Sequence, residues 1–123
     1  KDAEDRYTTE PWLGDFGVIP RSLHDEFAAT AVQHGAIIEI NVGAMLLTRK
    51  YADPFKRKYL EYIAYLKERR VRLCFGSDCH SARYDTDLAL AEEMLASVRI
   101  GDDDLWRLPI ESRIPQSCRG ETP

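Results

Sequence analysis

The chain has few of the residues on which disulfide-rich, secreted or membrane-embedded proteins depend. It contains three cysteines, none of them in a CxxC pair, which indicates reduced thiols rather than a disulfide framework. No run approaches the roughly 20 apolar residues that a membrane-spanning helix needs. Residues 1–10 lack the apolar core of a signal peptide. The sequence therefore predicts a cytoplasmic protein that does not insert into membranes.

The chain also lacks a dominant charge of one sign. Its formal net charge is −4, and acidic and basic residues are mixed along the sequence. No broad electrostatic surface for nucleic acid or an anionic membrane is therefore expected. An anionic substrate would have to be held locally, by metal ions or by a few arginines.

The length limits the architecture to one domain, because the chain has only 123 residues. The first residue is not an initiator methionine, which indicates a fragment or a processed chain. We expect an N-terminal loop segment at 1–21, an α/β unit at 22–109 and a flexible tail at 110–123, where periodicity is lost and turn formers gather.

Helical and strand patterns alternate through the α/β unit. Helices are predicted to begin at Ser22, at Asp53-Pro54 and after a cap at Asp85 or Thr86, with a last short helix at Leu105-Trp106. Buried strands are predicted at 36–42 and 71–75, with at most a further short strand at 16–19. This order is typical of α/β units, whose strands pair in parallel through right-handed crossovers.

The most informative residues follow the second predicted strand, where the sequence reads Phe75-Gly-Ser-Asp-Cys-His-Ser81. Asp78 and His80 are two apart, so an extended strand would project both side chains to the same side at its carboxyl end. α/β folds place their sites at that edge. A carboxylate and an imidazole there suit Zn²⁺, Mn²⁺ or Fe²⁺. The alternative is a capped turn in which Asp78 accepts backbone N–H bonds and His80 lies on the surface.

Two motifs together resemble the C-terminal half of the polymerase and histidinol phosphatase (PHP) domain family. Residues 76–81, Gly-Ser-Asp-Cys-His-Ser, resemble the Gly-Ser-Asp-Ala-His-Ser signature that closes such domains. Residues 34–41, His-Gly-Ala-Ile-Ile-Glu-Ile-Asn, resemble the family's strand ending in Glu-Ile-Asn, which is also followed by a loop bearing an arginine-lysine pair, here Arg49-Lys50. The resemblance extends over residues 22–109.

The resemblance implies a fold and an activity. The fold is the C-terminal portion of a distorted seven-stranded (βα) PHP-type barrel, incomplete as a single chain, with residues 22–109 as an α/β half-barrel. The activity is metal-dependent phosphoester hydrolysis, in which a metal-bound hydroxide attacks phosphorus while the metals neutralise the developing charge. The substrate of a complete domain would be a phosphorylated small molecule or a nucleotide.

The resemblance also implies roles for particular residues. Asp78 and His80 match the two metal ligands of the signature, with zinc, manganese or iron as the metal. Glu39 and Asn41 would support them from behind. Arg49 would lie near the substrate phosphate, although an ordinary basic loop is the alternative for this residue.

The chain departs from the family in its early ligands. The His-x-His strand of a PHP domain is not present, and Trp12 stands where a histidine ligand is expected, although an indole nitrogen can only donate a hydrogen bond. Two ligands hold a metal weakly, so this chain alone would bind metal substoichiometrically or not at all, and it is expected to be inactive.

Two kinds of partner follow from this incompleteness. Either the missing N-terminal half lies on another chain, or a second copy covers the open edge and makes a homo-oligomer. The alternative function is a non-catalytic PHP remnant that serves as an interaction or structural module.

The remaining candidates favour ordinary structural roles. His34 falls on the apolar stripe of the first helix and favours a packed or partly exposed position, whereas His24 in its first turn favours a solvated position. Cys79 would point away from the Asp-x-His pair and pack. The tyrosines of the second helix favour core and rim packing; they are Tyr59, Tyr62 and Tyr65.

Overall fold

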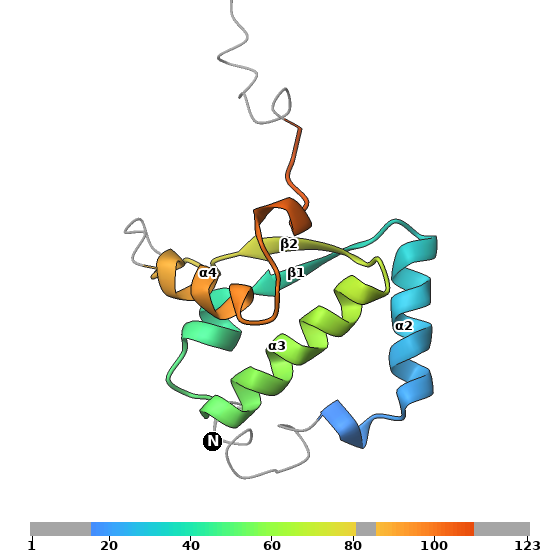
Figure 1. Ribbon diagram of the computed structural model, residues 1–123, viewed down its shortest axis with the longest axis horizontal. Helices are drawn as coiled ribbons and strands as arrows, with labels where there is room; N and C mark the ends of the chain where they lie inside the picture. The colour runs from blue at the N-terminus through green and yellow to red at the C-terminus, as the bar shows by residue number, and fades with distance from the viewer. Residues whose placement is uncertain (1–15, 81–85, 110–123) are drawn as a thin grey trace, which may run out of the picture.

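The computed structural model describes residues 16–80 and 86–109. The chain begins with a 3-10 turn η2 (Phe16–Val18), helix α2 (Arg21–Gln33) and strand β1 (Ile37–Asn41). A π-helical turn η3 (Gly43–Leu47), helix α3 (Asp53–Glu68) and strand β2 (Arg72–Gly76) follow, and then helix α4 (Leu88–Ala96) and a 3-10 turn η4 (Asp102–Asp104). Figure 1 shows α3 running along the two strands, with α2 and α4 on opposite sides of it.

Helix α3 connects the two strands, and its sequence explains where it begins and which face it buries. It starts at Asp53 with a proline in its first turn, where the missing N–H of proline has no intrahelical partner to lose. Tyr59, Ile63 and Leu66 recur at helical spacing and are 8%, 2% and 1% exposed. The predicted helix start at Asp53 is confirmed.

The two strands form a parallel pair. The register places Ile38 opposite Leu73 and Ile40 opposite Phe75, and opposed residues in a sheet project to the same face. This shared face packs under α3, since Ile40 is fully buried and Leu73 is 1% exposed. Glu39 lies between Ile38 and Ile40 in β1, so it projects from the opposite face.

The outer edge of β2 is partly paired by the end of the described chain. Leu105 forms an isolated parallel bridge with Leu73, and the Trp106 N–H donates to the Leu73 carbonyl at 2.7 Å. A lysine of α3, Lys67, holds the turn before this bridge through an ion pair with Asp104 at 2.8 Å. The predicted short helix at Leu105-Trp106 is therefore wrong, because these residues lie extended along β2.

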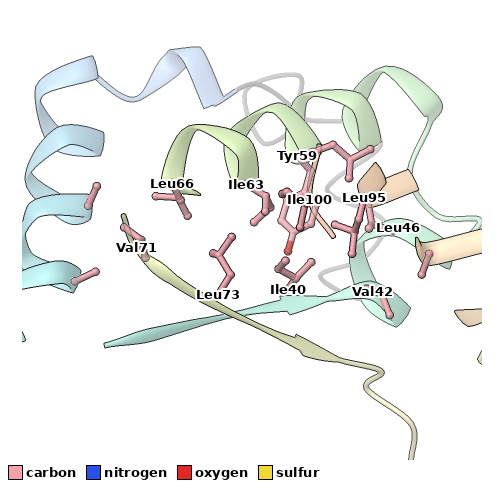
Figure 2. Close-up of a cluster of buried hydrophobic side chains, with 14 residues drawn as sticks. Ile40, Val42, Leu46, Tyr59, Ile63, Leu66, Val71, Leu73, Leu95 and Ile100 are labelled. Carbon is pink, nitrogen blue, oxygen red and sulfur yellow. The ribbon is translucent and has the colours of Figure 1, made fainter. Parts of the chain in front are cut away.

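The hydrophobic core lies between the sheet and the helices, and Figure 2 shows its side chains converging from α3, both strands, η3 and α4. Every buried residue among those described is apolar or aromatic. Full burial of a leucine or isoleucine contributes about 1.5–3 kcal/mol, so this cluster is the main source of stability. The largest fully buried side chains are Ile40, Leu46, Ile63, Leu66, Leu73 and Val42.

The expected barrel portion is wrong. The described chain contains four helical elements of the α or π type and one two-stranded parallel sheet, which is a small mixed α/β unit. A βαβ crossover takes about 30 residues or more, so a chain of this size supplies one crossover rather than a wall of barrel strands. The α/β class and the parallel strand order are correct, but the half-barrel is not formed.

Three smaller expectations are also corrected or left open. Residues 16–18 form a 3-10 turn instead of the start of a short strand. Helix α4 begins at Leu88 and is capped by Asp87, whose carboxylate accepts from the Leu90 N–H at 3.0 Å. Most of the predicted N-terminal loop, Asp85 and the whole of the predicted tail at 110–123 lie outside the described residues.

Where the chain is described, it contains no helix that is both long enough and apolar enough to cross a bilayer.

A candidate metal centre at the carboxyl end of strand β2

The loop that follows β2 carries the predicted ligands. The strand ends at Gly76, and Asp78 has a φ of 55°, in the left-handed region that aspartate tolerates better than most residues. The Cys79 N–H donates to the Ser77 hydroxyl at 3.2 Å and closes a local turn. The chain therefore turns sharply before His80 instead of continuing as the extended strand that the sequence predicts.

The turn nevertheless brings the two predicted ligands into contact. His80 Nε2 lies 3.0 Å from Asp78 Oδ1, and the side chains are 86% and 39% exposed. An ion pair this exposed contributes about 0–1 kcal/mol, so the contact does little for stability. One carboxylate oxygen and one imidazole nitrogen thus lie next to each other on the surface, and both are ligand types that Zn²⁺, Mn²⁺ and Fe²⁺ accept.

These two donors fit a divalent cation only in part. Within residues 16–80 and 86–109, no group of three or more histidine, cysteine, aspartate or glutamate side chains could share a metal ion. Catalytic metal sites usually have three protein ligands. The described residues therefore supply part of a ligand set, and residues 81–85 lie outside what the structure describes.

Glu39 and Asn41 lie near the pair but contact the backbone around it. A Cβ on Gly76 would lie 2.3 Å from Glu39 Oε1, so the Glu39 carboxyl rests directly on the last residue of β2. Asn41 Oδ1 accepts from the Ala44 N–H at 2.9 Å, at the start of η3. Their predicted support of Asp78 and His80 stays a prediction, and these contacts show how each of them could act.

The turn after β1 touches the loop after β2. A Cβ on Gly43 would lie 2.2 Å from the Ser77 carbonyl oxygen and 3.5 Å from the Asp78 Cβ. Only glycine leaves room for this approach. The ends of the two strands are therefore packed backbone against backbone, directly beside the candidate ligands.

Arg49 lies in the loop after η3. Its side chain is exposed, and it makes no hydrogen bond or ion pair with any described residue. A free guanidinium can bind a phosphate in a bidentate manner, but the structure gives Arg49 no contact with Asp78 or His80. Its predicted role at the phosphate stays a prediction.

His24 is a structural residue that sequence reasoning placed wrongly in solvent. Its Nε2 lies 2.9 Å from the Phe16 carbonyl and its Nδ1 lies 3.0 Å from the Tyr62 hydroxyl. Because a carbonyl only accepts, Nε2 carries a proton, and in the neutral ring Nδ1 accepts from the tyrosine. The histidine thus ties η2 to α3. His34, in contrast, is exposed as the C-cap residue of α2.

A second polar cluster joins α2 to α3. The Tyr65 hydroxyl donates to Asp25 Oδ1 at 2.5 Å, and Arg69 Nη2 lies 2.7 Å from the same oxygen. The Arg69 guanidinium also stacks 3.7 Å above the Tyr65 ring. These contacts, the Tyr65 hydrogen bond first, hold the pKa of Asp25 below its ordinary value. No local sequence pattern predicts the cluster, because Asp25 is 40 positions from Tyr65 and 44 from Arg69.

A cavity of about 810 Å³ lies away from the candidate ligands. It opens between β2, α4 and the extended end of the chain, and Phe75, Leu95 and Trp106 are among its mostly apolar lining residues. Neither Asp78 nor His80 lines it. The candidate ligands and this cavity thus lie in different places.

Searches of protein-family models, of curated proteins and of solved structures found no match to this chain. The resemblance to the PHP family therefore rests on residues 34–41, 49–50 and 76–81 alone.

Proposed function

We propose that this chain is a divalent-metal-binding module of a PHP-type phosphoesterase with an incomplete ligand set. The observation that supports it is the contact of Asp78 Oδ1 with His80 Nε2 at 3.0 Å, directly after strand β2. The two residues occupy the ligand positions of the Gly-Ser-Asp-x-His-Ser signature that the sequence resembles. The donor chemistry and the motif therefore support the same site.

The chemistry follows from these donors. A divalent cation, when bound, lowers the pKa of a coordinated water towards 7 and so supplies a nucleophile at neutral pH. Asp78 and His80 would hold such an ion, and the free guanidinium of Arg49 would bind an oxygen of a phosphorylated small molecule or nucleotide. Since two ligands hold metal weakly, turnover is expected only when another chain or segment completes the site.

Calorimetric titration of the metal-free chain with Zn²⁺ and Mn²⁺ tests the proposal. Wild-type protein is expected to bind at least one of the two ions, and the double variant Asp78→Ala/His80→Ala to bind neither. The matched control is Asp103→Ala/His34→Ala, which removes the same two side-chain types at exposed positions elsewhere and is expected to bind like wild type. Absence of binding by the wild type refutes the proposal.

Activity provides a separate test of incompleteness. The chain alone is expected not to hydrolyse p-nitrophenyl phosphate in the presence of either metal. Hydrolysis that disappears in the Asp78→Ala/His80→Ala variant would show that the ligand set is complete in this chain.

A second candidate function, a non-catalytic interaction module, is favoured by the surface of η2 and α2. Helix α2 buries only Ala28 and Ala31. Five of the large exposed apolar side chains lie in η2, in α2 or in the link between them, with exposures of 44–53%: Val18, Ile19, Leu23, Phe27 and Val32. The missing N-terminal half or a second copy of the chain would cover this surface. Light scattering tests it: self-association that is lost in Leu23→Ser/Phe27→Ser supports a second copy, and a monomer speaks against one.

A further inference from the structure

The loop that carries Asp78 is supported from the end of the neighbouring strand. Gly43 begins η3, and its Cα lies so close to the Ser77 carbonyl that a Cβ would come within 2.2 Å of the oxygen. The same Cβ would be 3.5 Å from the Asp78 Cβ. The position of the Gly43 backbone therefore limits where the backbone of Ser77 and Asp78 can lie.

Asn41 fixes the position of this turn. It is the last residue of β1 and stands opposite Gly76 in the register of the sheet. Its side-chain oxygen accepts from the Ala44 N–H at 2.9 Å, which satisfies one of the N–H groups that a helical turn leaves without an intrahelical partner. Val42 and Leu46 anchor the turn in the hydrophobic core, since the two residues are 0% and 1% exposed.

We infer that Asn41 is a positioning residue for the Asp78–His80 pair, and that it acts through the Gly43 turn instead of touching either side chain. Asp78 has a φ of 55°, a conformation that a non-glycine residue keeps only when its surroundings hold it. The backbone of Gly43 packs against that loop. The hydrogen bond from the Ala44 N–H to the Asn41 side chain stabilises the turn that contains Gly43. The consequence for metal affinity rests on the proposed function, whereas the effect on the loop does not.

Glu39 is the weaker candidate for this role. Its carboxyl rests on Gly76, but the residue is exposed, and the end of an exposed side chain can rotate away at little cost. Asn41 instead makes a directional hydrogen bond to a turn whose neighbours are buried. The backbone contact between Gly43 and Ser77 therefore transmits the influence of Asn41 to the pair more rigidly than the Glu39 side chain could.

The test compares Asn41→Ala with Asn41→Asp, which keeps an oxygen acceptor for the Ala44 N–H. Backbone amide shifts of the metal-free proteins are recorded by NMR, and Zn²⁺ affinity is measured by calorimetry. Asn41→Ala is expected to shift the amides of residues 77–80 and to weaken Zn²⁺ binding about 10- to 100-fold, the effect typical of residues that orient metal ligands. Asn41→Asp is expected to restore both. The control, Thr48→Ala, removes the 3.2 Å bond to the Lys50 N–H in the following loop and should leave residues 77–80 unchanged.

Each outcome decides something. Unchanged amides at 77–80 in Asn41→Ala overturn the positioning role, and shifted amides with unchanged Zn²⁺ affinity overturn its link to the pair. A wild type that binds no Zn²⁺ refutes the proposed function alone, because the amide comparison is made without metal. If Asn41→Ala does not fold, Asn41→Leu keeps the side-chain bulk without the acceptor and is expected to give the same shifts.

Discussion

Substitution of Gly43 by alanine tests the contact between the two strand ends most directly. The added Cβ would lie 2.2 Å from the Ser77 carbonyl oxygen and 3.3 Å from its carbon, whereas ordinary van der Waals contact begins at 3.4 Å. The obstructing atoms belong to the backbone, so no side-chain rotation can relieve the overlap. Either the η3 turn or the loop after β2 has to move by about 1 Å, and both are attached to buried strands.

The cost follows from the size of this overlap. Overpacking of a well-packed site typically costs about 1–3 kcal/mol, and a backbone clash belongs in the upper part of that range. We expect about 2–3 kcal/mol, a large share of the 5–15 kcal/mol that holds a typical domain together. For a domain of this size each kcal/mol lowers Tm by about 4–8 °C, so Tm is expected to fall by about 8–24 °C.

Two other glycines separate the clash from the general effect of adding a methyl group. Gly101 has nothing within 4 Å of a Cβ and a negative φ, so Gly101→Ala should change stability by less than about 0.5 kcal/mol. Gly35 is equally open but has a φ of 62°, and Gly35→Ala should cost about 1–2 kcal/mol through its left-handed backbone. Urea denaturation followed by circular dichroism gives the three values. A Gly43→Ala midpoint equal to that of Gly101→Ala would refute the packing argument.

Two further predictions concern the pH dependence of stability. The pKa of Asp25 is lowered by Tyr65 and Arg69, so its contribution is present above the unfolded value of 3.8 and is lost as pH falls through the lower folded pKa. Asp25→Asn should therefore have a lower Tm than wild type at neutral pH and the same Tm at about pH 2. A difference in Tm that persists in acid would contradict this. Burial raises the pKa of Tyr59 above 10.0. A backbone hydrogen bond to Asn41 lowers this pKa in part, and the nearby Glu39 raises it further. The contribution of Tyr59 is complete below pH 10.0 and is lost as pH rises through the folded pKa, so urea midpoints of Tyr59→Phe should decline less in alkali than those of wild type. Parallel declines would exclude Tyr59 as a cause.

The sequence predicts the helices and strands well where local signals are strong. Asp53 and the proline after it fix the start of α3, and the β-branched runs place both strands within one residue of where they lie. The prediction fails where distant contacts decide the conformation. Phe16 stacks on Tyr62 with ring centroids 4.9 Å apart, and this contact across 46 positions accompanies a 3-10 turn where an apolar run suggested a strand.

The fold prediction failed for a different reason. The resemblance to a barrel family supplied an architecture that the chain is too short to build, and residues 16–80 and 86–109 complete only one parallel crossover. Leu105 pairs with Leu73 at the outer edge of β2. No sequence pattern predicted this pairing. Motif resemblance can thus indicate which residues carry chemistry without fixing how many strands surround them.

The alternation of side chains along a strand was not sufficient to predict the geometry of the candidate site, which lies just after a strand ends. Alternation along a strand would place Asp78 and His80 side by side, and the structure does place them 3.0 Å apart, but through a turn with a left-handed aspartate. The direction of each side chain then depends on what supports the turn, and that support comes from the end of β1. A residue far away in the sequence, Gly43, is consequently expected to influence the pair more than its immediate neighbour Cys79, whose substitution by serine leaves the backbone contact intact.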